Sequence, residues 1–196
     1  MNRFLFTPAL MVVLMAQIEA QAEENSKVKL SVIAKNTIYQ LDTGGLSTKA
    51  YKQKLLDLKM ALMKGEETAD PPAAPAIDLS LEIKNISMEE ITIYVGGNPC
   101  FHTFEIKGPG VVELNPRLIR AAIFAFPRAI KLAAGKSYEL PIHKLADGSH
   151  GDSRWIYWTE TGEYTLTASY KLGGPNGAPG PVLKSEPVTF KIEQKK

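Results

Sequence analysis

Strict alternation of apolar and polar residues is the feature of this sequence that most constrains its fold. Five segments show it: residues 28–32, 78–84, 91–95, 164–170 and 188–192. Successive side chains of a β-strand point to opposite faces, so a period of two places each apolar set on one buried face. Strands with one buried and one wet face are typical of antiparallel sheets that pack as a sandwich. The sequence therefore predicts a mainly β protein, an immunoglobulin-like antiparallel β-sandwich.

One segment near the N-terminus departs from this pattern. Within residues 47–64, apolar side chains recur at helical spacing, at Tyr51, Leu55, Leu58 and Leu62. Ser47 or Thr48 is suited to cap the start of a helix and Gly65 to end it. We expect an amphipathic helix that packs over an edge or end of the sandwich. The alternative is a helix that binds a partner or a membrane surface, although its narrow stripe without Trp or Phe argues against membrane insertion.

The helix is followed by a proline-rich tether that ends in Pro71-Pro72-Ala73-Ala74-Pro75. Such a composition favours an extended backbone. We interpret residues 27–75 as N-terminal strands, helix and tether, and residues 76–196 as the β-sandwich domain. The first part has too few apolar residues to fold alone, so we expect both to form a single sandwich.

Residues 1–22 are predicted to be a cleaved export signal. Arg3 precedes an almost wholly apolar run at residues 4–18, and Ala20-Gln21-Ala22 has the small-x-small shape of a signal-peptidase site. The apolar run, about 15 residues, is shorter than the roughly 20 that cross a bilayer. An uncleaved anchor is the alternative. We expect a secreted or periplasmic protein with no stable membrane insertion after cleavage.

The charge and cysteine content of the sequence limit which classes of partner it can bind and which interactions can stabilise it. Lys and Arg number 23 and Asp and Glu 21, a net charge of +2, which offers no concentrated basic face for nucleic acid. The single cysteine, Cys100, excludes a disulfide within the chain. We expect Cys100 to be a small buried residue, with an intermolecular disulfide or a reactive thiol as the alternatives. Packing alone then stabilises this exported domain.

The sequence contains no nucleophile elbow, phosphate-binding loop or dinucleotide fingerprint. Cys100 and His102 would share one face of a strand, which leaves a thiolate pair as a weak alternative. His143, His150 and Asp152 lie in one stretch, but the histidines lack the close spacing usual in metal sites. We therefore expect no enzyme activity, no metal and no cofactor.

The segment 155–158 is heavily aromatic on both faces of a predicted strand. Trp155 and Tyr157 share one face, and Ile156 and Trp158 share the other. We expect one tryptophan in the core between the sheets. The other, with Tyr157, either packs under the helix or forms an exposed contact surface. The candidate contact residues are Trp155, Tyr157, Trp158 and, in the Gly- and Pro-rich loop 173–181, Asn176.

Two shorter motifs concern the framework. Tyr164 follows Gly162-Glu163, as in a tyrosine corner, where a tyrosine near the start of a strand bonds back to upstream backbone. Asn85-Ile86-Ser87 matches a glycosylation sequon, which matters only in a eukaryotic host. Both motifs indicate turns between strands.

Four segments together carry a resemblance to known proteins: LEIKNISMEEITIYVGG, AAGKSYELPI, GEYTLTASYKL and SEPVTFKIE. Their order resembles bacterial exported immunoglobulin-like β-sandwich proteins of unknown function. It is also distantly similar to the intracellular proteinase inhibitor (BsuPI-like) domain family. The resemblance spans about residues 78–192 and implies the sandwich fold and, from the second family, inhibition of a protease.

These observations favour a non-catalytic binding or structural module of the cell envelope. We expect a monomer whose partner is an unknown protein or envelope component. The alternative is a protease inhibitor that acts through an exposed loop, for which residues 173–181 are the candidate. A metal-binding protein or an enzyme is the least favoured class.

Overall fold

The computed structural model describes residues 27–116, 125–149 and 152–195. The predicted export signal at residues 1–22 lies outside them, as does His150. Within the described residues, the strands are β1 (Val28–Ala34), β2 (Ile38–Leu41), β3 (Ala76–Asn85), β4 (Ile91–Val95), β5 (Phe101–Lys107), β6 (Val111–Leu114), β7 (Arg128–Leu132), β8 (Ser137–Lys144), β9 (Ala146–Ser149), β10 (Asp152–Trp158), β11 (Gly162–Gly173), β12 (Pro179–Lys184) and β13 (Val188–Gln194). The helices are α2 (Thr48–Lys64) and the short 3₁₀ helix η1 (Pro175–Gly177).

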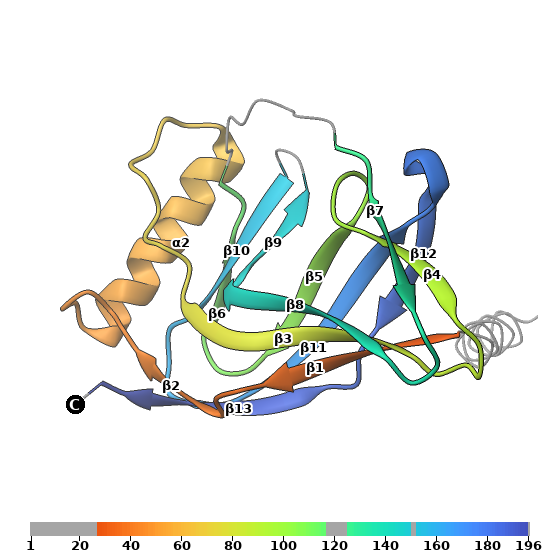
Figure 1. The fold of residues 1–196 in the computed structure, drawn as a ribbon. Helices are drawn as coiled ribbons and strands as arrows, with labels where there is room; N and C mark the ends of the chain where they lie inside the picture. The colour runs from red at the N-terminus through yellow and green to blue at the C-terminus, as the bar shows by residue number, and fades with distance from the viewer. Residues whose placement is uncertain (1–26, 117–124, 150–151, 196) are drawn as a thin grey trace, which may run out of the picture.

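The strands form three sheets (Figure 1). The largest has the order β2-β13-β11-β4-β7, with β5 and β12 also paired to β11. A second sheet, β1-β3-β8, covers it, and a third, β6-β10-β9, lies next to the helix. The strand pairs are antiparallel except β13 with β2, which are parallel. The predicted mainly β sandwich with one helix is confirmed, and each of the five alternating segments lies in a strand.

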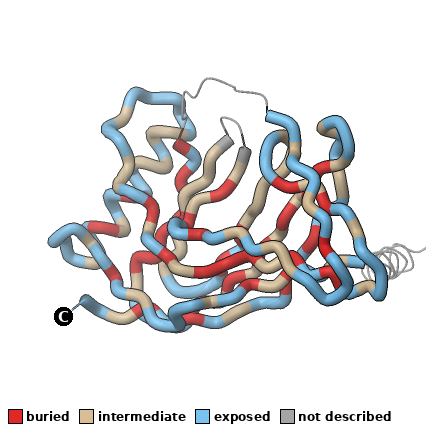
Figure 2. The backbone as a smooth tube through the Cα atoms, viewed as in Figure 1, coloured by how far each residue is buried: buried red, intermediate tan, exposed pale blue. Residues whose placement is uncertain are grey.

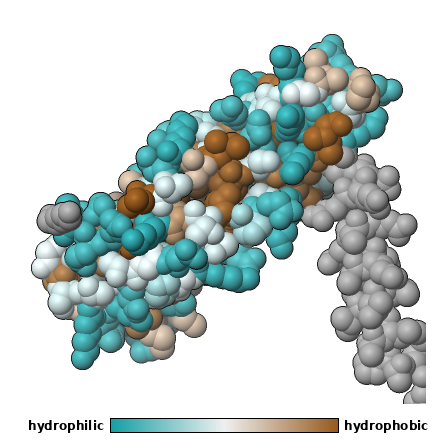
Figure 3. All heavy atoms as spheres, turned by 90° about the horizontal axis from the view of Figure 1, so that it is seen from below, coloured by the Kyte–Doolittle hydropathy of each residue, from teal (hydrophilic) through white to brown (hydrophobic). Residues whose placement is uncertain are grey.

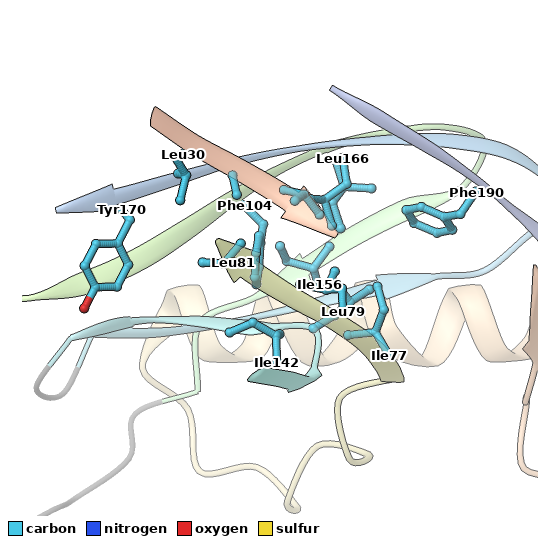
Figure 4. Packing of buried hydrophobic residues seen from close by; sticks show 14 of the residues in the cluster. Leu30, Ile77, Leu79, Leu81, Phe104, Ile142, Ile156, Leu166, Tyr170 and Phe190 are labelled. Carbon is cyan, nitrogen blue, oxygen red and sulfur yellow. The ribbon is translucent and has the colours of Figure 1, made fainter. Parts of the chain in front are cut away.

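The main core lies between the first two sheets. Buried positions alternate with exposed ones along the strands (Figure 2), as the period of two predicts. Leu81 and Ile142 of the smaller sheet point into the same space as Phe104 and Leu166 of the larger one (Figure 4). Ile156 also belongs to this core, so the third sheet closes one end of the sandwich.

Helix α2 covers the outer face of the third sheet. Ser47 is the N-cap, and its Oγ accepts a hydrogen bond from the Ala50 amide at 3.2 Å. Gly65 ends the helix with φ +73°, a left-handed conformation that favours glycine. Tyr51 and Leu55 pack in a second core with residues of β6 and β10. The predicted helix therefore exists, and it packs on the sandwich.

The predicted tyrosine corner is present at the start of β11. The single proton of the Tyr164 hydroxyl is shared between two backbone carbonyls, that of Glu160 at 2.7 Å and that of Pro109. A Cβ on Gly108 would lie 2.3 Å from the Tyr164 ring, so the turn before β6 requires glycine. Burial raises the pKa of Tyr164 to about 12. This hydroxyl ties the turn between β5 and β6 to the start of β11.

Asn85, the sequon residue, is a framework residue. Its side chain is 0% exposed and donates to the carbonyls of Glu89 at 2.7 Å and Leu132 at 2.9 Å. Its Oδ1 accepts from the Ser87 amide at 2.9 Å and the Ser87 hydroxyl at 2.7 Å. A glycan on this amide is incompatible with the fold, because both of its protons are used inside.

The Gly- and Pro-rich tract differs from the expected loop. Residues 173–181 were predicted to be a loop between the last two strands, but β12 begins at Pro179 and pairs with β11. Glycine makes this pairing possible, since a Cβ on Gly180 would lie 2.5 Å from the Gly173 carbonyl oxygen. The loop is therefore a tight hairpin turn around η1, with Asn176 at φ +56°.

A buried ion pair joins the third sheet to the large one. Asp147 of β9 accepts two hydrogen bonds from Arg154 of β10, at 2.7 and 3.0 Å. The same Asp147 accepts the Phe104 amide at 2.5 Å, while Arg154 donates to the Phe104 carbonyl. Phe104 lies in β5, whose other edge pairs with β11. On the edge of β5 that faces away from β11, the Asp147 and Arg154 side chains therefore make the hydrogen bonds to Phe104 that the backbone of a neighbouring strand would otherwise make.

The side of the sandwich seen from below carries hydrophobic side chains among hydrophilic ones (Figure 3). Strands β1, β2 and β13 lie on this side (Figure 1). Ile33 of β1 and Ile38 of β2 are exposed. Isolated exposed apolar residues are common on folded proteins and define no site by themselves.

Candidate functional site

A recess of about 670 Å³ lies where strand β2 and helix α2 meet the C-terminal end of the described chain. Five segments line it: β2 with the loop that follows, the first turns of α2, the tether at residues 72–76, the end of β10, and Lys195. Pockets of about 300–1,000 Å³ are the size that usually holds a small molecule. The recess is therefore the candidate functional site.

Aromatic rings form the floor of the recess. Tyr39 of β2 and Trp158 of β10 both line it, with ring centroids 5.8 Å apart. Phe190 of β13 lies behind both rings, at 5.6 Å from Tyr39 and 5.9 Å from Trp158. The Tyr39 hydroxyl bonds to the Asp78 backbone at 3.2 Å, and burial raises its pKa. Packing and this hydrogen bond fix the floor in position.

The tether forms one wall. The Tyr157 hydroxyl donates to the Pro72 carbonyl at 2.6 Å, and the Leu145 amide donates to the Pro75 carbonyl at 3.0 Å. Each bond anchors one end of a short proline-rich segment whose backbone is already stiff. These two bonds hold the tether wall in position.

The loop after β2 forms the rim. The Asp42 carboxylate accepts the Gly44 amide at 2.9 Å and pairs with Lys195 at 3.2 Å. These interactions, the Gly44 bond first, lower the pKa of Asp42. The Thr43 hydroxyl donates to the Leu46 carbonyl at 2.6 Å and orders the rest of the loop. The carboxylate at the rim is thus ionised and already paired.

Helix α2 forms the opposite wall, through Tyr51 and Lys54. Tyr51 is 7% exposed and packs against Tyr157 and Leu55 in the second core. Burial raises the pKa of its hydroxyl, and the nearby Asp42 carboxylate adds to this effect. Lys54 lies one helical turn further on and is exposed. This wall therefore presents hydrogen-bond donors above an aromatic floor.

The structure separates the four candidate contact residues. Trp158 is 4% exposed and belongs to the main core, with its edge at the recess floor, whereas Tyr157 is fully buried under α2. Tyr157 forms no part of an exposed contact surface, because the helix covers its face of β10, whereas Trp158 reaches the surface at the recess. Trp155 is partly buried beside the second core, and Asn176 is exposed at the distant hairpin turn.

Cys100 and His102 have separate partners. The Cys100 thiol lies 3.5 Å from the Tyr94 carbonyl, and burial raises its pKa. His102 Nε2 lies 3.2 Å from the Ala146 carbonyl, and burial lowers the pKa of this imidazole. A raised thiol pKa and a lowered imidazole pKa both oppose a thiolate–imidazolium pair. The geometry favours two framework residues.

Among the described residues, no group of three or more His, Cys, Asp and Glu side chains is placed to hold a metal ion. His143 is exposed on β8, and His150 lies outside the described residues. No helix in the described part of the chain is both long and apolar enough to cross a membrane.

Sequence reasoning missed most residues of the recess. Tyr39, Asp42 and Lys54 belong to segments that look like a short strand, a turn and a helix surface. A signal for Tyr51 was present, because it begins the apolar stripe of the helix, but the stripe predicts packing and not a site. Of the recess residues, only Trp158 was singled out as a candidate contact.

Comparison with known proteins adds no relative: no family model and no curated protein matches this chain. The recess and its residues are therefore the basis for inferring function.

Proposed function

We propose that this chain is a non-catalytic binding module of the cell envelope and that the recess is its binding site. The observation that carries the proposal is a ligand-sized recess whose floor, tether wall and rim are each held by their own contacts. A pre-formed site binds without first ordering its walls, which favours affinity.

The composition of the walls supports binding over catalysis. Ligand sites are mostly apolar with a few placed polar groups, and here Tyr39, Trp158 and the prolines supply the apolar part. The carboxylate among the described lining residues, Asp42, is ionised and paired with Lys195. Among the described lining residues there is no His, no Glu and no second Asp that could share a proton with this carboxylate.

The place of action is part of the proposal. The predicted export signal would deliver the mature chain to the periplasm or the medium. Its single cysteine is compatible with this location, because the domain is stabilised by packing and not by a disulfide within the chain. A binding module there would take up a small molecule or a component of the envelope.

The two tryptophans of the sequence offer a direct test. In a Trp155→Phe variant, Trp158 is the sole tryptophan and lies at the recess floor. Titration with a panel of small aromatic and aliphatic compounds should change its fluorescence saturably for at least one of them. The matched Trp158→Phe variant, whose remaining Trp155 is beside the second core, should respond weakly or not at all. Equal responses in both variants, or none in either, would contradict the proposal.

Protease inhibition is the second candidate function, and the hairpin turn 174–178 is the observation that favours it. Two backbone bonds constrain this exposed turn, Gly174 N to Ala178 O at 2.6 Å and Ala178 N to Pro175 O at 3.1 Å. A rigid exposed loop loses little entropy when it enters a protease cleft. Micromolar protein should then slow at least one protease in a panel, and an Asn176→Gly variant should inhibit less; no effect on any protease would refute this candidate.

A further inference from the structure

Two donors on the helical wall have no hydrogen-bond or ion-pair partner among the described residues. The Tyr51 side chain makes no hydrogen bond within the described residues, although it is 7% exposed. Every fully buried side-chain N or O atom in that part of the chain has a hydrogen-bond partner. The Tyr51 hydroxyl must therefore keep access to solvent, and the recess that it lines provides that access.

Lys54 is the second donor. It follows Tyr51 by three positions, a spacing that places both side chains on one side of the helix. Two nearby lysines are paired, Lys52 with Glu160 at 2.7 Å and Lys195 with Asp42 at 3.2 Å. Lys54 has no ion pair among the described residues. The charged groups that line the recess are thus a matched Asp42–Lys195 pair and one additional ammonium group.

We infer that the recess binds a small carboxylate with a flat apolar body, the carboxylate accepting hydrogen bonds from Lys54 and Tyr51. The inference rests on the proposed function and names its ligand class. The apolar body would pack against the half-buried Tyr39 ring and the small part of Trp158 that lines the recess, where aromatic contact stabilises a flat molecule. Charge-assisted hydrogen bonds are about twice as strong as neutral ones. A cationic ligand would instead face the Lys54 ammonium with no free carboxylate to receive it.

Three probes of one shape distinguish this inference from the general proposal: 2-naphthoate, 2-naphthamide and 2-naphthylmethylammonium. Titration calorimetry on the purified full chain should give the tightest binding for the carboxylate, at least 10-fold tighter than the amide, and the weakest for the cation. Equal binding of all three, or preference for the cation, would overturn the carboxylate inference and leave the recess as a binding site. Binding of none of them would overturn the carboxylate inference, and the panel on the Trp155→Phe variant would then decide the proposed function separately.

Variants locate the recognition. Tyr51→Phe keeps the buried ring and removes the hydroxyl, and Lys54→Gln keeps an exposed polar side chain on the helix. Each should weaken 2-naphthoate about 5- to 10-fold and change 2-naphthamide less than about 2-fold, as the loss of one charge-assisted hydrogen bond predicts. Lys49→Gln, an exposed lysine of the same helix outside the recess, is the control and should change neither. If Lys49→Gln matches Lys54→Gln, the attraction is unspecific and the inference fails.

Discussion

Replacement of Arg154 by methionine tests whether a side-chain pair joins two sheets of this sandwich. Methionine keeps the apolar stem of the side chain and removes the guanidinium. Asp147 would lose both of its bonds to Arg154, and the Phe104 carbonyl would lose its donor. The Phe104 amide would be the one remaining partner of the Asp147 carboxylate in the described residues.

The expected cost follows from burial. The Asp147 side chain is 1% exposed and that of Arg154 is 26% exposed. Breaking a buried pair by removing one partner costs about 3–5 kcal/mol, because it leaves an uncompensated buried charge. Water can enter on the partly exposed arginine side, so we expect the lower end, about 3 kcal/mol. With a urea m-value of about 2 kcal/mol/M, the midpoint of unfolding should fall by about 1.5 M.

Urea unfolding followed by fluorescence measures this effect. Arg128→Met is the matched control, since Arg128 is exposed on β7, and it should change stability by less than about 0.5 kcal/mol. The double variant Arg154→Met/Asp147→Asn should be less destabilised than the sum of the two single variants by about 1.5 kcal/mol or more. A cost below about 1 kcal/mol for Arg154→Met, or additive single effects, would refute the role of this pair.

Three further predictions concern other framework groups. Asn85→Ala should lower the free energy of unfolding by about 3 kcal/mol, because it leaves the Glu89 and Leu132 carbonyls without this donor; a urea midpoint equal to that of the parent chain would contradict the role assigned to Asn85. Burial raises the pKa of Tyr164 and of Tyr170 to about 12, above the ordinary value of 10.0, so the folded state keeps these protons longer than the unfolded state. Their contribution to stability should therefore be complete below pH 10 and decline toward pH 12, and a Tyr164→Phe/Tyr170→Phe variant should show a shallower decline; an unchanged slope would contradict it. Burial also raises the pKa of Cys100, so iodoacetamide should modify the folded protein at pH 7.5 at least about 10-fold more slowly than it modifies the urea-unfolded chain. Equal rates of modification would show that the Cys100 thiol is accessible and unprotected in the folded protein.

The fold was predictable where the pattern is local. Alternation located β1, β3, β4, β11 and β13, and cap residues located both ends of α2. Strands β6 and β9 span four residues each, too few for a period of two to stand out. Strand β12 was hidden by its glycine and prolines, which usually indicate a loop but here allow a close pairing with β11.

The recess was not predictable for a different reason. Tyr39, Tyr51 and Trp158 come together because β2 pairs in parallel with β13 and the tether is anchored to β10. Neither contact can be predicted from a local sequence pattern, since both join segments that are far apart in the chain. The aromatic strand at 155–158 was predictable as a dense packing element, and the covering of both its faces by core and helix required the assembled structure.

The pairing of β2 with β13 also has a consequence for biosynthesis. Strand β2 is synthesised well before its partner β13, because most of the described chain lies between the two strands. The floor and rim of the recess are therefore completed only after β13 and Lys195 have been synthesised, so a nascent chain that lacks these residues cannot acquire the ligand. The same arrangement guides protein production: because Lys195 forms part of the rim, an affinity tag joined next to this residue would be placed at the mouth of the recess.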